Sequence, residues 1–324
     1  MKTRQLGKEG PFLTEVGLGA WAIGGPWAWG WGPQDDQQSV ETIRRAIDLG
    51  INWIDTAAVY GLGHGEEVVG QAIRERRKDI FLATKCGLVW DDRRRVRNNL
   101  RPESIRRECE NSLRRLNTDY IDLYQIHWPD PKTNVEDSWG EMIRLKEEGK
   151  VRYIGVSNFD IPLLEKCNSI EPVQSLQPPY SMLHRILYPD VEKEILPWCK
   201  EHGVGVVVYS PLQNGLLTGK FTKERLESLP PDDWRHKSEF FKEPFFSRTL
   251  KFVERLKPIA EKYRKSLTDL AIAWVLMNPA VTSAIVGARR PEQVEENIDG
   301  SGWQISEGDL KEIERFTTEI FQNR

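Results

Sequence analysis

Short apolar runs alternate with helix-period segments along most of the 324-residue chain. This alternation is typical of parallel βαβ units, because a parallel neighbouring strand is reached only through a crossover connection. We count eight strand–helix units, which favours a closed (β/α)8 barrel over an open sheet. The predicted strands are Val16–Trp21, Ile51–Asp55, Ile80–Lys85, Tyr120–Trp128, Val151–Phe159, Val173–Gln177, Val204–Tyr209 and Ser283–Val286.

Apolar residues recur every three or four positions between these runs, as expected for helices packed on a barrel. Lys2–Gln5 and Phe12–Glu15 predict a hairpin before the first unit, and Ser306–Phe321 predicts a terminal helix across the barrel. We therefore predict one α/β domain over residues 1–324, a TIM barrel with a hairpin cap and a C-terminal helix. The other predicted helices are Gln37–Leu49, Glu66–Arg76, Pro102–Leu116, Val135–Glu148, Ile161–Cys167, Val191–His202, Leu267–Met277 and Pro291–Ile298.

Three connections are unusually long or unusual in composition. The arginine-rich stretch Trp90–Leu100 and the stretch Phe221–Phe246 are expected to be loops, which at such lengths are functional lids or disordered. For Arg93–Arg97 a solvated charge run is favoured over phosphate recognition. The loop Ile23–Pro33 contains three tryptophans, which either pack on neighbouring helices or line a substrate pocket.

The bulk composition excludes several partners. Forty-six Lys and Arg residues against 49 Asp and Glu residues give a formal charge of -3, which provides no general attraction to nucleic acid or to an anionic membrane. The sequence has neither the apolar core of a signal peptide nor an apolar run that could cross a bilayer, so we expect a cytoplasmic protein. Its four cysteines form no CxxC pair, which favours reduced thiols over a zinc or disulfide framework.

Polar residues end or closely follow several predicted strands. Asp55 ends the second strand and Tyr60 follows in its loop, while Lys85 and His127 stand at the ends of the third and fourth. Such residues meet on one face of a (β/α)8 barrel. Each has an ordinary role when taken alone: a loop anchor, a solvated strand end, a core histidine or a cap. Their occurrence at neighbouring strand ends favours a catalytic site.

Seven motifs, in order, resemble those of the aldo-keto reductases, from Gly17 to about Phe316. The resemblance implies a TIM barrel whose hairpin caps the closed end, and the NADPH-dependent reduction of aldehydes or ketones. Gly287 and Gln293 stand where many members have lysine and arginine, which is similar to the branch of bacterial general-stress reductases and potassium-channel β subunits. The motifs are GLGAW (Gly17–Trp21), DTAAVYG (Asp55–Gly61), LATK (ending at Lys85), QIHWPD (Gln125–Asp130), GVSNF (Gly155–Phe159), SPLQNGLLTGK (Ser210–Lys220) and GARRPEQVEEN (Gly287–Asn297).

The resemblance assigns catalysis to Asp55, Tyr60, Lys85 and His127. Tyr60 would act as general acid, and a neighbouring Lys85 ammonium should lower its pKa from the usual value of about 10. Asp55 would be the counter-ion of Lys85, since an unpaired buried charge is costly. His127 would donate a hydrogen bond to the substrate oxygen.

By the same resemblance, Ser157, Asn158 and Gln177 bind the nicotinamide carboxamide and Tyr209 stacks on its ring, although Gln177 could instead belong to a buried polar ladder. Lys220 would contact the pyrophosphate and Arg289 the 2′-phosphate, which favours NADPH over NADH. Gln293, Glu296 and Asn297 on the helix Pro291–Ile298 would hold the adenine, or this would be only a capped, solvated helix. The full set is Trp21, Asp55, Ser157, Asn158, Gln177, Tyr209, Ser210, Pro211, Leu212, Gly215, Lys220, Gly287, Arg289, Gln293, Glu296 and Asn297.

The expected partner is a small-molecule carbonyl compound; the pattern specifies no oligomeric state. An aromatic wall would suit an apolar or aromatic substrate, whereas the arginine-rich loop would suit a phosphorylated or carboxylated one. The alternative function is a redox-sensing regulatory protein that binds NADP(H) and turns over slowly. A metal-dependent hydrolase is disfavoured, because the five histidines form no ligand set, and no metal is expected. The predicted substrate residues are Trp21, Trp31, Tyr60, Trp90, His127 and Trp128.

Overall fold

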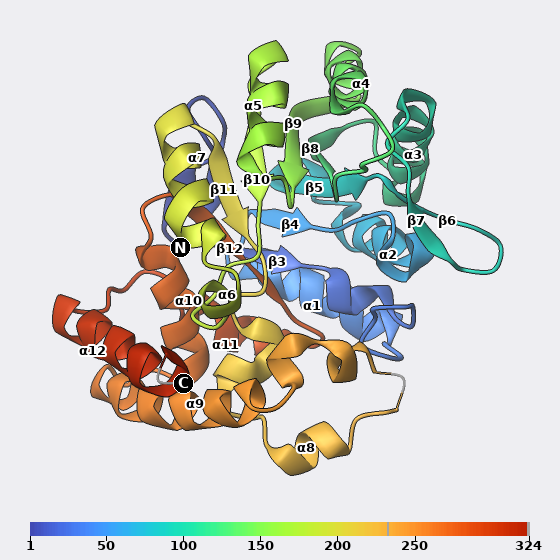
Figure 1. Cartoon of the computed structure of the whole chain (residues 1–324). Coiled ribbons are helices and arrows are strands. Elements are labelled where there is room, and N and C mark those ends of the chain that lie inside the picture. The colour runs from blue at the N-terminus through green and yellow to red at the C-terminus, as the bar shows by residue number, and fades with distance from the viewer. Residues whose placement is uncertain (232, 323–324) are drawn as a thin grey trace.

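The computed structural model describes residues 1–231 and 233–322, and its centre is a closed barrel of eight parallel strands (Figure 1). The barrel closes where β12 pairs with β3, with Ala284 opposite Val16 and Gly287 opposite Gly19. The predicted fold is therefore confirmed. In their order around the barrel the strands are β3 (Val16–Gly19), β4 (Trp53–Asp55), β5 (Phe81–Cys86), β8 (Ile121–Ile126), β9 (Val151–Ser157), β10 (Ser175–Gln177), β11 (Gly205–Val208) and β12 (Val281–Gly287).

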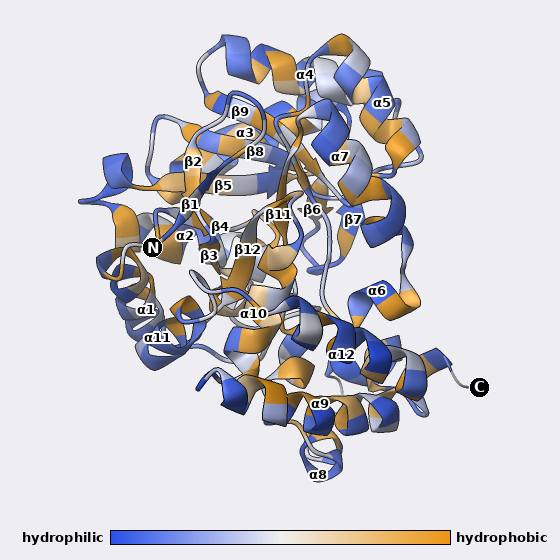
Figure 2. Cartoon of the chain, turned by 90° about the vertical axis from the view of Figure 1, so that its left-hand side faces the viewer, coloured by the Kyte–Doolittle hydropathy of each residue, from blue (hydrophilic) through white to orange (hydrophobic). Residues whose placement is uncertain are grey.

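Helices surround this barrel and bury their apolar faces against it, so hydrophobic and hydrophilic colours alternate along them in Figure 2. Local signals fix their ends: Asp35 caps α1, and Ser266 with Asp269 forms a capping box on α10. The helices of the ring are α1 (Asp36–Asp48), α2 (His64–Ile73), α3 (Pro102–Leu116), α4 (Val135–Glu147), α5 (Ile161–Ile170), α7 (Leu196–His202), α10 (Leu267–Met277) and α11 (Pro291–Ile298).

The barrel interior is filled from the N-terminal ends of its strands. The hairpin of β1 (Thr3–Gln5) and β2 (Phe12–Thr14) closes this end, and the indole nitrogen of the fully buried Trp53 donates to Ser283 Oγ at 3.0 Å. Gly17 leaves room for this indole, since a Cβ there would lie 2.0 Å from the ring. The interior cluster comprises Leu6, Leu13, Trp53, Ala83, Leu123, Val207 and Ile285. Only the C-terminal ends of the strands therefore remain for a site.

Two segments expected to be loops contain regular structure. The arginine-rich stretch takes part in an antiparallel hairpin of β6 (Leu88–Trp90) and β7 (Val96–Asn98), whose turn is tied by Asp91 Oδ1 accepting from two backbone N–H groups. The second stretch contains α8 (Lys223–Glu227) and runs into α9 (Phe245–Lys262), which begins inside the expected loop. Its aromatic residues pack on one another, which explains why the segment is folded. Phe221, Phe241 and Phe246 form one group, and Phe240 packs on Phe245.

The terminal helix α12 (Glu307–Thr317) forms as predicted, but the expectation that it lies across the barrel is wrong. It lies beside α9 at the edge of the molecule (Figure 1), where Asp309 accepts from Lys262 Nζ at 2.8 Å and from the Tyr263 hydroxyl. These contacts fix it to α9. A short helix, α6 (His184–Leu187), follows β10 and was not predicted. None of the helices in the described ranges is long and apolar enough to cross a membrane.

Candidate active site

The four residues proposed for catalysis come together at the C-terminal ends of neighbouring strands. Asp55 is the last residue of β4, Lys85 lies in β5, His127 directly follows β8, and Tyr60 begins a short 3-10 helix. Lys85 Nζ lies 2.6 Å from Asp55 Oδ2, 2.8 Å from the Thr56 carbonyl oxygen and 3.3 Å from the Tyr60 hydroxyl. The lysine is thus the hub of the cluster.

Lys85 and Asp55 form a buried ion pair whose side chains are 0% and 3% exposed. Gln177 adds a hydrogen bond from Nε2 to the other oxygen of Asp55 at 2.8 Å, so both carboxylate oxygens are occupied. Burial lowers the pKa of Lys85, and Asp55 opposes that change by favouring the ammonium. The carboxylate therefore keeps a cation beside Tyr60.

The pKa of Tyr60 departs from the sequence-based expectation. Burial, and secondly the negative charge of Asp55, raise it well above 10, whereas we expected Lys85 to lower it. The physical reason is that a phenolate in a dry site loses its hydration and lies near a carboxylate as well as an ammonium. Tyr60 is therefore a protonated phenol in this structure and has a proton to donate.

His127 is a neutral imidazole. Its pKa is held well below 6.5 by burial and by the positive charge of Lys85. Its ring packs edge to face with Tyr60 at 5.8 Å between centroids. A neutral ring can donate a hydrogen bond without adding a charge to the site.

Close backbone contact between two loops positions Tyr60. Gly61 has φ +64°, and a Cβ there would lie 1.9 Å from the carbonyl oxygen of Gly24 in the first strand–helix loop. The same loop places the Trp27 ring 5.9 Å from the Tyr60 ring. Trp27 was assigned only to the tryptophan cluster, because its contact with Tyr60 depends on this loop packing.

Beside the cluster, the residues expected at the nicotinamide form one chain of hydrogen bonds. The Tyr209 hydroxyl donates to Asn158 Oδ1 at 2.9 Å, and Asn158 Nδ2 donates to Ser157 Oγ at 2.9 Å and to the His127 carbonyl at 3.0 Å. Ser157 Oγ donates to the Gln177 carbonyl at 2.8 Å. The chain continues through Gln177 to Asp55 and so connects to the lysine.

The segment expected at the phosphates continues from Tyr209 through Ser210, Pro211 and Leu212 into a 3-10 helix, Gln213–Thr218. Gly215, at φ +93°, faces open space, since a Cβ there would meet no atom within 4 Å. Glycine backbone that faces open space in this way fits the close approach of a phosphate. Lys220 Nζ lies 3.0 Å from Glu296 Oε2, so two predicted cofactor residues pair with each other.

The adenosine end is organised around the turn between β12 and α11. Asn297 Nδ2 donates to the carbonyl of Gly287 at 3.2 Å, and Gln293 Oε1 accepts from the backbone N–H of Arg289 at 2.8 Å. The Arg289 guanidinium faces the first loop and donates to Gln34 Oε1 at 2.6 Å. Gln34 was not predicted, because a single polar residue in a loop carries no periodic signal.

An aromatic wall stands over the site. Trp21 packs on Trp31 at 5.9 Å and on Trp234 at 5.5 Å, and Trp31 lies 6.4 Å from Trp234. Trp234 comes from the stretch expected to be a loop and was missed as a member of the wall. Trp128 follows His127 with 44% of its surface exposed.

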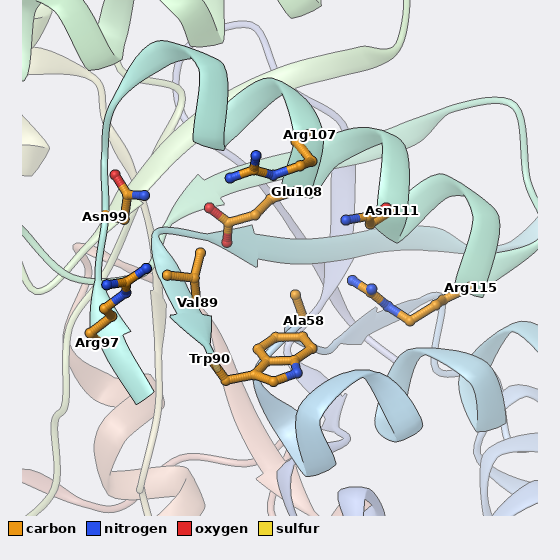
Figure 3. A pocket seen from close by; sticks show the side chains of 9 residues that line it. All are labelled: Ala58, Val89, Trp90, Arg97, Asn99, Arg107, Glu108, Asn111 and Arg115. Carbon is orange, nitrogen blue, oxygen red and sulfur yellow. The ribbon is translucent and has the colours of Figure 1, made fainter. Parts of the chain in front are cut away.

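Trp90 packs on the cluster of Ala57, Val59 and Tyr60, and its other side borders a cavity of about 360 Å³ under the hairpin β6–β7 (Figure 3). Glu108 is at its floor, and burial raises the pKa of this carboxyl to about 7. None of the four proposed catalytic residues is among those that line it, which are Ala58, Val89, Trp90, Arg97, Asn99, Arg107, Glu108, Asn111 and Arg115.

The arginine run is mainly a surface feature. Arg95 pairs with Asp91 in the turn, and Arg94 donates to the carbonyl of Pro26. Of the run, only Arg97 reaches the cavity. In the described part of the chain no group of three His, Cys, Asp or Glu residues could hold a metal ion, and all four cysteines are buried free thiols.

Comparison with known proteins agrees with this geometry. Residues 15–317 match the model of the aldo/keto reductase family. Aldo-keto reductase YhdN of Bacillus subtilis (strain 168) is 40% identical over 97% of this chain and 92% of that protein, and a protein named NADH-specific methylglyoxal reductase of Escherichia coli (strain K12) is 37% identical over 95% and 96%. The solved structure of the glycerol dehydrogenase AKR11B4 from Gluconobacter oxydans superposes with a TM-score of 0.89 at 40% identity, covering 99% of this chain and 96% of that one. The chain therefore belongs to the aldo-keto reductase family.

Proposed function

We propose that this protein reduces aldehydes or ketones to alcohols with NADPH, and that Tyr60 supplies the proton. The observation that carries the proposal is the contact of 3.3 Å between the Tyr60 hydroxyl and Lys85 Nζ, which is itself paired with Asp55. A protonated phenol beside a buried ammonium is arranged to give up a proton and to have the resulting phenolate stabilised. Family membership supports the use of a nicotinamide cofactor.

The reaction needs a hydride for the carbonyl carbon, which the bound nicotinamide supplies. Tyr60 gives its proton to the oxygen as negative charge develops there, and Lys85 stabilises the phenolate that remains. His127, as a neutral donor, orients the carbonyl. Solvent then returns a proton to Tyr60. The balance is one carbonyl compound, one NADPH and one proton consumed for each alcohol and NADP+ formed.

The cofactor assignment rests on the hydrogen-bonded residues at the strand ends. Asn158 and Gln177 would hold the carboxamide, Tyr209 would stack on the ring, and the backbone near Gly215 would receive the pyrophosphate. The preference for NADPH rests on Arg289, while the name of the E. coli relative shows that an NADH-specific protein can be 37% identical to this chain. NADPH and NADH must therefore be measured side by side.

The test is oxidation of NADPH and of NADH, followed by absorbance, with aliphatic, aromatic and acidic aldehydes. We expect Tyr60→Phe to lower turnover by about a thousand-fold, within the range known for general acids, while the affinity for NADPH changes less than about two-fold. Tyr153→Phe, a change in the barrel interior away from the cluster, is the control and should keep full turnover. Parallel loss of cofactor affinity in Tyr60→Phe would refute the role of Tyr60. Tight NADPH binding without turnover on any aldehyde would favour the redox-sensing alternative.

A further inference from the structure

All three nitrogens of the Arg289 guanidinium donate to one loop, through three of its five N–H groups. Its Nε donates to Gln34 Oε1 at 2.6 Å, Nη1 to the carbonyl of Trp31 at 3.3 Å, and Nη2 to the carbonyl of Pro33 at 2.5 Å. Gln34 returns a hydrogen bond from Nε2 to the carbonyl of Arg289 at 2.9 Å. The Gln34 amide thus hydrogen-bonds both the side chain and the backbone of Arg289, and we call this pair of bonds the grip.

All of the acceptors around this guanidinium are uncharged. Among the described residues Arg289 has no carboxylate within ion-pair distance, whereas the nearby Arg235 is paired with Asp233 at 2.6 Å. Burial and the neighbouring Arg235 both lower the pKa of Arg289, so the site carries excess positive charge. A dianionic 2′-phosphate would relieve this excess, whereas a ribose hydroxyl would not.

We infer that Gln34 determines cofactor preference by competing with the 2′-phosphate of NADPH for Arg289. This inference rests on the proposed function, in which Arg289 meets that phosphate. A phosphate that accepts from Nε must displace Gln34 Oε1, because the single N–H of Nε is already donated to that oxygen. NADH makes no such demand and leaves the grip intact. Affinity for NADPH therefore includes the cost of breaking the bond between Arg289 Nε and Gln34 Oε1.

The same grip connects the two ends of the cofactor site. The loop that Arg289 holds contains Trp31, whose ring packs on Trp21 and Trp234 and lies 4.7 Å from the guanidinium carbon of Arg235. Release of Arg289 frees the carbonyl of Trp31 itself. A 2′-phosphorylated cofactor will therefore shift the aromatic wall, and NADH will not.

The experiment measures binding of 2′,5′-ADP and 5′-ADP by calorimetry, because these fragments need neither nicotinamide nor a carbonyl substrate. We expect Gln34→Ala to tighten 2′,5′-ADP by about five-fold, as loss of a competing charged hydrogen bond would, and to leave 5′-ADP unchanged. Arg289→Ala should abolish the difference between the fragments. The matched controls are Gln37→Ala, a glutamine whose amide donates to Glu41 on α1, and Arg290→Ala, the exposed neighbouring arginine; both should behave as wild type.

A second measurement reports on the aromatic wall through tryptophan fluorescence. Binding of 2′,5′-ADP should change tryptophan fluorescence more than binding of 5′-ADP does, and the excess should vanish in Trp31→Phe. The inference is overturned if Gln34→Ala weakens or does not affect 2′,5′-ADP binding, or if both fragments give the same fluorescence change. The reductase assay with NADH stays independent of these results, so failure here and failure of the proposed function can be told apart.

Discussion

Two buried aspartates lie at opposite ends of the barrel and differ in their hydrogen-bond and ion-pair partners. Asp122, at the N-terminal end of β8, accepts from Arg77 at 2.7 Å, from Arg152 at 2.9 Å and from the backbone N–H of Leu82 at 3.0 Å. Asp55, at the C-terminal end of β4, accepts from Lys85 and Gln177. Both carboxylates are nearly fully buried.

The partners make the difference. Arginine keeps its charge at every physiological pH, so Asp122 is held in a permanent clamp that joins β5 to β8. Lysine can lose its proton when it is buried, and the pKa of Lys85 is lowered. The Asp55 pair touches the phenolic hydroxyl of Tyr60, whereas the Asp122 pair touches the aliphatic hydroxyl of Thr118. We therefore expect a buried ion pair to serve stability at one end of the barrel and, under the proposed function, chemistry at the other.

Replacing Lys85 should lower both the turnover and the stability of the protein. In Lys85→Met we expect turnover to fall by about a thousand-fold, because Tyr60 loses the cation that stabilises its phenolate. Asp55 is left as an unpaired buried charge, which should cost about 3–5 kcal/mol of unfolding free energy. Steady-state kinetics and urea unfolding measure the two effects. Lys78→Met, at an exposed site, is the control, and a variant of Lys85 with normal turnover would contradict the assignment.

The corresponding change at the other end should separate stability from activity. Asp122→Asn leaves Arg77, only 12% exposed, without its carboxylate, and should lower the unfolding free energy by about 3 kcal/mol. Turnover per folded molecule should stay within about two-fold of wild type, because no contact of Asp122 reaches Tyr60. The exposed Asp119→Asn serves as control in the same unfolding experiment. A large loss of turnover in folded Asp122→Asn would show that the two ends are coupled.

A third buried carboxyl, Glu108, sharpens the comparison because its charge lacks an ion-pair partner in the described structure. Burial raises its pKa from 4.5 to about 7, although hydrogen bonds from the Gly87 N–H and the Ser104 hydroxyl, and the charge of Arg115, oppose this change. Between these pH values the folded state binds the extra proton, so this group's contribution to stability falls as pH rises from about 4.5 to about 7. The total change is about 3 kcal/mol.

Glu108→Gln should remove that slope. Chemical unfolding at pH 4.5 and pH 7.5 gives the unfolding free energies of wild type and variant. From the lower to the higher pH, the wild type should lose about 3 kcal/mol of stability relative to the variant. Glu110→Gln, an exposed change on the same helix, should show no comparable shift. Equal pH dependence in wild type and Glu108→Gln would mean that Glu108 titrates normally.

The sequence was sufficient for the barrel and for the four-residue cluster, because both depend on signals close together in the chain. An apolar run and a polar residue at its end predicted where Asp55, Lys85 and His127 would stand, and closure of the barrel brought them together. The direction of the Tyr60 pKa was wrong, since burial depends on the surrounding loops and outweighs the neighbouring ammonium.

What the sequence did not predict depends on packing between distant segments. Trp234 joins Trp21 and Trp31 only because the long stretch after Phe221 folds over its own phenylalanines. Helix α9 did have a signal, since buried residues recur at Phe252, Leu256 and Ile259, but Pro258 lies within it and concealed the pattern. The strands of the hairpin β6–β7 are only three residues long and are separated by a charged turn, so no hydrophobic alternation marked them.

Closure of the barrel has a consequence for how the protein is made. The strand that completes the ring, β12, ends at Gly287 and pairs with β3, which begins at Val16. A ribosome must therefore synthesise most of the chain before this pair can form, so any sheet that a shorter nascent chain forms is open, with two unpaired edges. Chains truncated before Gly287 should consequently be the ones that aggregate or recruit chaperones during translation.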